Sequence, residues 1–134
     1  MKKFYLFLFI ALAWTISASA QVPAFPGADG YGRYTTGGRG GEVYYVTSLE
    51  DTDTPGTLRY GVTHLSKVTI LFKVSGTIQL NSSLNIRGSN ITIAGQSAPG
   101  DGICLAGYPV SVSGSNVIVR YMRFRMGDWL SLIH

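Results

Sequence analysis

The alternation of apolar and polar residues repeats itself along the chain, over residues 84–93 and 110–119. In both stretches apolar residues occupy alternate positions on either side of a turn, which is the period of half-buried β-strands. Equivalent positions lie 26 residues apart, and the Gly-Ser-Asn turn at 88–90 returns unchanged at 114–116. Glycine and asparagine tolerate the backbone of tight turns. A strand, a tight turn, a second strand and a longer loop at a fixed period predict stacked coils of a parallel β-helix.

Further strands are predicted by the same alternation at 42–47, 68–74, 77–80 and 116–125, so that about three coils are expected. Residues 55–65 differ, because their apolar residues recur at helical spacing. Thr54 suits the N-cap of this helix and Pro55 its first position. We expect the short helix to cap the apolar end of an all-β solenoid.

Asn90 and Asn116 hold the same turn position in successive coils. Two interpretations are open. Their amides stack in a ladder along the solenoid, or each asparagine is present only because it tolerates the turn conformation.

The N-terminus consists of Met1-Lys2-Lys3, an apolar run over 4–14 and an Ala-Ser-Ala sequence ending at Ala20. This order predicts a signal peptide over residues 1–20 and export to the periplasm or the extracellular space. The alternative is a signal-anchor, but a membrane span needs roughly 20 apolar residues. Residues 21–134 then form one small domain that has no membrane association after cleavage.

Composition narrows the classes of partner. The net charge is +4 for the whole chain, but without Lys2 and Lys3 nine basic residues face seven acidic ones, which leaves +2. So small a charge argues against a nucleic-acid partner. The single cysteine, Cys104, lies between apolar neighbours and is expected to be buried and inert rather than reactive.

Four groups of residues are candidates for chemistry. The Gly37–Gly41 segment lacks the strand, helix and Lys-Ser/Thr of a phosphate loop, so we expect a mobile surface loop. Arg123 and Arg125 share one face of the last predicted strand and Arg120 lies on the other. The pair is the candidate substrate-binding site for anionic groups, with a merely solvated face as the alternative.

The remaining candidates are acidic residues and histidines. Asp51 and Asp53 lie in a polar loop, either as calcium ligands or as solvated carboxylates. His64 and His134 have no partner at ligand spacing. We therefore assign no catalytic residue and no metal ligand. Residues 128–134 lack the strand alternation, so the chain is expected to be the truncated front part of a longer protein.

Several ordered blocks of the sequence resemble the N-terminal part of secreted pectate lyases. They are Ala24-Phe25-Pro26-Gly27-Ala28-Asp29-Gly30-Tyr31-Gly32, Gly37-Gly38-Arg39-Gly40-Gly41, Pro55-Gly56-Thr57-Leu58-Arg59, Val74-Ser75-Gly76-Thr77-Ile78, Ile91-Thr92-Ile93-Ala94-Gly95-Gln96-Ser97-Ala98-Pro99-Gly100 and Asn116-Val117-Ile118-Val119-Arg120-Tyr121. The resemblance implies a right-handed parallel β-helix and a secreted enzyme that cleaves α-1,4-polygalacturonate by β-elimination. It also implies Ca²⁺ that neutralises the uronate carboxylate and acidifies the C5 proton, with an arginine as base.

In the family, the calcium ligands and the catalytic arginine follow the segment that matches Arg125-Met126-Gly127-Asp128. The expectation is therefore an N-terminal fragment of a pectate lyase that lacks catalytic residues and calcium ligands and is inactive by itself. One alternative is a non-catalytic β-helix module that binds acidic plant polysaccharide through Arg123 and Arg125. Another is a fragment without a stable fold.

Overall fold

The computed structural model describes residues 20–127. The predicted signal peptide, apart from residue 20, and His134 lie outside this range. None of the helices within it is long and apolar enough to cross a membrane. The elements in chain order are β1 (Glu42–Val46), α2 (Leu58–His64), β2 (Val68–Phe72), β3 (Gly76–Gln79), β4 (Leu84–Ile86), β5 (Ile91–Ala94), the 3₁₀ turn η1 (Gly95–Ser97), β6 (Ile103–Gly107), β7 (Val110–Val112), β8 (Val117–Arg120) and β9 (Met122–Met126).

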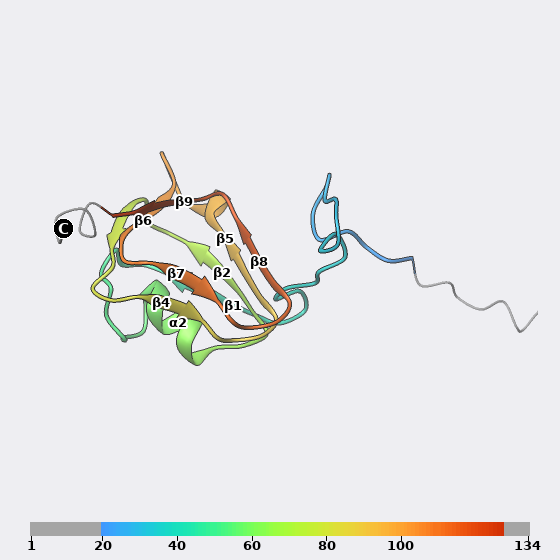
Figure 1. Cartoon of the computed structure of the whole chain (residues 1–134), viewed down its shortest axis with the longest axis horizontal. Coiled ribbons are helices and arrows are strands. Elements are labelled where there is room, and N and C mark those ends of the chain that lie inside the picture. The colour runs from blue at the N-terminus through green and yellow to red at the C-terminus, as the bar shows by residue number, and fades with distance from the viewer. Residues whose placement is uncertain (1–19, 128–134) are drawn as a thin grey trace, which may run out of the picture.

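The strands form three sheets in which every pair is parallel. Sheet A has the order β1-β2-β5-β8, sheet B the order β3-β6-β9, and sheet C pairs β4 with β7. From β2 on, the chain visits sheets A, B and C in turn, and Figure 1 shows the strands stacked around one axis. This arrangement is the predicted all-β parallel β-helix.

The internal repeat gives the register directly. Leu84 pairs with Val110 between β4 and β7, and Ile91 pairs with Val117 between β5 and β8. The inward positions of successive coils therefore superimpose, and their apolar side chains form one continuous core. Burying such side chains stabilises the fold by roughly 1.5–3 kcal/mol each.

The two turn asparagines form the predicted ladder and also adopt the turn conformation, so the interpretation that they serve the turn alone was wrong. Asn90 and Asn116 have φ angles of 60° and 57°, the left-handed conformation that asparagine tolerates. The Nδ2 of Asn116 also donates to the Oδ1 of Asn90 at 2.7 Å, which is the predicted amide ladder. Beside it the hydroxyls of Ser89 and Ser115 lie 3.0 Å apart.

The capping helix begins later than predicted. Its N-cap is Thr57, whose hydroxyl accepts from the N–H of Tyr60 at 3.3 Å, so the prediction of Thr54 was wrong. Gly56 has a φ of 97°, and this left-handed residue prevents a helix from running through from Pro55. Helix α2 contacts β1 and β4, and in the first circuit it takes the place of a sheet C strand.

The hydroxyl of Tyr44 on β1 holds the start of α2. It accepts from the N–H of Gly56 at 2.8 Å and donates to the carbonyl of Thr57 at 2.8 Å. Burial raises the pKa of the Tyr44 phenol, against the lowering effect of the hydrogen bond from Gly56. The neutral phenol is therefore the form that fits this site.

The single strand predicted at 116–125 is two strands. Tyr121 has a φ of 56° and separates β8 from β9. As a result β8 extends sheet A while β9 extends sheet B. The prediction was wrong because a tyrosine is not a residue from which a left-handed turn is inferred.

The glycine-rich segment over residues 36–41, which we call the strap, lies against the outer face of sheet A. Gly37 and Gly38 are buried, and the N–H of Gly38 donates to Thr92 Oγ1 at 2.9 Å. A Cβ on Gly38 would lie 2.0 Å from the carbonyl oxygen of Val68. The amide oxygen of Asn116 accepts from the N–H groups of Thr36 and Gly37. The strap is fixed to the sheet, so the prediction of a mobile surface loop was wrong.

Candidate functional site

The outer face of sheet B carries the arginine pair that the sequence predicted. Along β9, Met122 packs against the core, so Arg123 and Arg125 point outward. Arg123 pairs with Cys104 and Arg125 pairs with Ala106, while Thr77 and Gln79 of β3 complete the two rows. We call these six positions the arginine face. It is composed of Thr77, Gln79, Cys104, Ala106, Arg123 and Arg125.

The guanidinium of Arg123 is partly engaged. Its Nη2 donates to the carbonyl oxygen of Asp101 at 2.8 Å, in the loop between η1 and β6. A guanidinium has five N–H donors, so most of them stay available to a ligand. The contact fixes where the Arg123 side chain lies while leaving it exposed.

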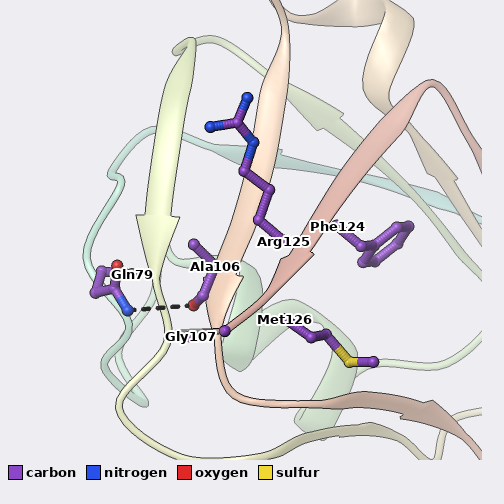
Figure 2. Close-up of a pocket in the computed structure, with 7 residues that line it drawn as sticks. Gln79, Ala106, Gly107, Phe124, Arg125 and Met126 are labelled. Carbon is purple, nitrogen blue, oxygen red and sulfur yellow. Dashed lines mark hydrogen bonds between the residues drawn. The ribbon is translucent and has the colours of Figure 1, made fainter. Parts of the chain in front are cut away.

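Arg125 borders a shallow groove at the ends of the sheet B strands. The groove has a volume of 430 Å³ and is lined by Gln79, Ala106, Gly107, Phe124, Arg125, Met126 and Gly127. Within the described part of the chain the Arg125 side chain makes no hydrogen bond or ion pair. Figure 2 shows its guanidinium directed away from Phe124 and Met126, which lie on the other side of β9.

The residues that line the groove include a cation and an amide on the outer side of sheet B, and Phe124 and Met126 on the other side of β9. The Gln79 Nε2 donates to the Ala106 carbonyl at 3.4 Å, leaving its amide oxygen free. Phe124 has an exposed fraction of 48% and Met126 one of 64%. Such a surface can bind a carboxylate at Arg125 and hydroxyl groups at Gln79.

Cys104 lies within the arginine face rather than in the hydrophobic core. It is buried, with an exposed fraction of 4%, and it is a free thiol. Ile103 and Leu105 beside it belong to the core, so the Cys104 side chain points to the outer side of β6. The prediction of burial is confirmed, although the buried position is an outward one beneath its neighbours.

Arg120 is separated from the arginine face. It lies on β8 in sheet A, and its Cζ is 4.0 Å from the ring centroid of Phe25 and 5.1 Å from that of Tyr121. These distances are typical of cation–π contacts, so Arg120 fixes the segment around Phe25. The left-handed turn at Tyr121 ends β8, and for this reason Arg120 and the arginine pair belong to different sheets.

Asp51 is neither solvated nor free to bind calcium. Its carboxylate accepts two 2.8 Å hydrogen bonds from Arg59 and one of 2.7 Å from the N–H of Asn81, and only 1% of its side chain is exposed. The interpretation as a solvated loop residue was wrong for Asp51. Little in the sequence indicated this burial, because the partners of Asp51 come from other elements: Arg59 is on α2 and Asn81 follows β3.

Asp53 and His64 form an exposed pair, with Oδ1 and Nε2 2.8 Å apart. The sequence shows no partner for His64 at metal-ligand spacing, and the contact with Asp53 arises because α2 returns His64 to the loop that carries Asp53. Between residues 20 and 127 no three His, Cys, Asp or Glu side chains gather as a metal site. We derive no step of chemistry through calcium on these residues.

Sequence reasoning missed Gln79 and the groove around it. The alternation in residues 76–79 places Gln79 outward, but its neighbours across the sheet depend on loop lengths that differ from coil to coil. No periodic signal in the sequence joins β3, β6 and β9.

Known proteins with similar sequences and structures were found for this chain. No protein-family model matches the sequence. The chain is 43% identical over 119 residues to a protein named probable pectate lyase C from Emericella nidulans, covering 88% of this chain and 28% of that protein. It is 42% identical over 121 residues to the protein of the same name from Aspergillus fumigatus, covering 90% and 28%. The chain thus spans about 28% of the length of these curated relatives.

A plant relative and a solved structure agree with the fungal proteins. Pectate lyase 1 from Hesperocyparis arizonica is 46% identical over 72 residues, covering 52% of this chain and 19% of that protein. The crystal structure of Jun a 1, the major allergen from cedar pollen, superimposes with a TM-score of 0.61 and 33% identity, covering 72% of this chain and 29% of that one.

Proposed function

The chain is a partial homologue of the pectate lyases, and from this premise we propose that its coils are the N-terminal part of a secreted enzyme acting on pectate. The proposal is supported by identities of 42–43% over about nine-tenths of the chain and by the β-helix itself. The curated relatives are more than three times as long, so activity and substrate come to this chain only as proposals.

We further propose that the arginine face binds the acidic polysaccharide. The single observation that carries this assignment is the pair of outward arginines on β9, one of them without a protein partner among the described residues. Alternate residues of a strand lie roughly 6.6–6.8 Å apart, so the two guanidinium groups can meet two carboxylates of one extended chain. No acidic residue occupies the rows that these arginines share with β3 and β6.

The chemistry of such contacts favours uronates over neutral sugars. A guanidinium donates two parallel hydrogen bonds to a carboxylate, and a charge-assisted bond is roughly twice as strong as a neutral one. The open groove beside Arg125 leaves room for the sugar ring next to Gln79. Binding through exposed charges also weakens as salt is added.

For catalysis, we propose that residues 1–134 alone perform no β-elimination. Elimination needs a group that stabilises the charge on the uronate and a base at C5. Asp51, the one buried carboxylate among the described residues, already pairs with Arg59. Calcium binding, which the resemblance to pectate lyases implies, is therefore expected only of a longer protein and not of residues 1–134.

Retention on immobilised polygalacturonate tests the arginine face. We expect Arg125→Ala to reduce retention of the chain, and Arg123→Ala/Arg125→Ala to abolish it at low salt. Arg87→Ala is the matched control, because it removes the same charge from an exposed position outside the face. Equal retention of the Arg125→Ala and Arg87→Ala chains would refute the assignment.

Incubation of the chain with polygalacturonate and Ca²⁺ tests the catalytic proposal. We expect no rise in absorbance from a conjugated, unsaturated uronate product. The second candidate, a non-catalytic module that binds acidic polysaccharide, also predicts retention without product, because the same arginine face serves both functions. Formation of product by residues 1–134 would overturn the proposal of inactivity.

A further inference from the structure

A second surface outside the arginine face also suits an acidic sugar. We call it the tyrosine patch, defined by Gly30, Tyr31, Arg33 and Tyr34, which line a shallow hollow of 340 Å³. In Figure 1 the segment that carries it, shown in blue, projects beyond the sheets. Tyr31 is fully exposed and Tyr34 has an exposed fraction of 40%.

Backbone hydrogen bonds fix the tyrosine patch. The N–H of Arg33 donates to the carbonyl of Gly30 at 3.2 Å, and the carbonyl of Arg33 accepts from Ala24 at 2.7 Å. Arg39, from the strap, donates to the carbonyl of Pro23 at 3.0 Å. The segment is therefore joined to itself and to the strap, so the backbone that carries the exposed rings is held in place.

The side chains of the tyrosine patch divide into two roles. The Tyr31 ring has both faces free of protein. The Cζ of Arg33 lies 4.8 Å from the centroid of the Tyr34 ring, so the guanidinium stacks on that ring. Stacking leaves the in-plane N–H groups open, and Arg33 has no ion pair or side-chain hydrogen bond among residues 20–127.

We propose that the tyrosine patch is a second binding site for a uronic-acid-containing oligosaccharide, distinct from the arginine face. The C–H bonds on one side of a sugar ring meet the electron-rich face of Tyr31, and the sugar carboxylate meets the N–H edge of Arg33. The choice of ligand rests on the proposed function. A stacked nucleobase with its phosphate would need a similar surface, but the small net charge of the chain favours the sugar.

Affinity electrophoresis of the full chain tests the inference in gels that contain polygalacturonate or its methyl ester, which has the same ring without the charge. We expect Tyr31→Ala to weaken binding by about fivefold in both gels, because it removes the stacking face. Arg33→Gln should weaken binding only to the acidic polymer. Tyr31→Phe keeps the ring and should retain binding.

Tyr108→Ala is the matched control, because Tyr108 is 45% exposed at a turn outside both surfaces. The inference is overturned when Tyr31→Ala binds like Tyr108→Ala, when the unsubstituted chain binds neither polymer, or when an oligothymidylate binds more tightly than polygalacturonate. Loss of binding in Tyr31→Ala but not in Arg123→Ala/Arg125→Ala supports the tyrosine patch and removes the arginine face. Loss of binding in Arg123→Ala/Arg125→Ala but not in Tyr31→Ala supports the arginine face and removes the tyrosine patch. Failure of the tyrosine patch can therefore be distinguished from failure of the proposed function.

Discussion

Removal of Arg59 tests how strongly one buried ion pair holds the first coils together. Arg59 of α2 donates two 2.8 Å hydrogen bonds to Asp51, and the same carboxylate accepts a 2.7 Å bond from the N–H of Asn81. Arg59 also donates to the carbonyls of Ser82 and Ser83. One pair therefore joins the loop before α2, the helix itself and the turn between β3 and β4.

The two partners differ in exposure, and this sets the expected order of effects. Only 1% of the Asp51 side chain is exposed, against 17% for Arg59. Arg59→Met leaves a buried carboxylate without its counter-charge, and we expect a loss of about 4 kcal/mol in the free energy of unfolding. Asp51→Asn leaves a guanidinium that water can reach, so we expect a smaller loss of about 2–3 kcal/mol.

Urea unfolding followed by far-UV circular dichroism measures both losses. In the double variant Asp51→Asn/Arg59→Met, the costs should not add, with a coupling of about 2 kcal/mol. Asp53→Asn is the control, because it breaks the exposed pair with His64 and should cost about 0–1 kcal/mol. Additive losses, or an Arg59→Met effect no larger than that of Asp53→Asn, would refute the reasoning.

Three further predictions concern the cap, the strap and the ladder. Tyr44→Phe should lower the free energy of unfolding by about 1–3 kcal/mol, because it leaves the N–H that bonds to the phenol unsatisfied. Because the pKa of the Tyr44 phenol is raised in the folded state, its contribution is complete below about pH 10 and is lost as the pH rises through the folded value. Urea unfolding should therefore show a smaller gap between the two chains at about pH 11 than at about pH 8, and an unchanged gap would contradict the argument. Gly38→Ala should detach the strap, because the new Cβ meets a backbone oxygen at 2.0 Å, whereas Gly32→Ala meets only Thr35 Oγ1 at 3.5 Å and should be close to neutral. Limited proteolysis of the strap distinguishes them, and equal cleavage rates would count against a docked strap. Asn116→Ala should destabilise the fold by about 1 kcal/mol more than Asn116→Gly, since alanine adds the strain of a left-handed φ to the lost ladder. Thermal unfolding compares the two variants, and a wild-type midpoint for Asn116→Gly would show that the ladder adds nothing.

The coil architecture could be predicted from the sequence because its cause is local. Alternation marks the strands, and the repeated Gly-Ser-Asn turn fixes the register of β4 with β7 and of β5 with β8. The outward direction of Arg123 and Arg125 followed from the same period. The short helix ahead of the coils followed from the helical spacing of its apolar residues.

Contacts between distant segments could not be predicted in this way. The partners of Asp51, the docking of the strap on sheet A and the separation of Arg120 from Arg123 depend on how unequal loops bring unrelated segments together. The backbone conformation of Tyr121 belongs to the same class, since its residue type gives no indication of a left-handed turn.

The sequence by itself determined the period, the strand faces and the turns at Asn90 and Asn116, because each depends on residues that are neighbours along the chain or repeat one coil later. Only the tertiary structure decided which side chains share a surface. The arginine face joins three strands whose spacing varies, and the groove beside Arg125 exists because β3, β6 and β9 end together. These neighbours meet through packing across the coils, and no pattern along the sequence predicts them.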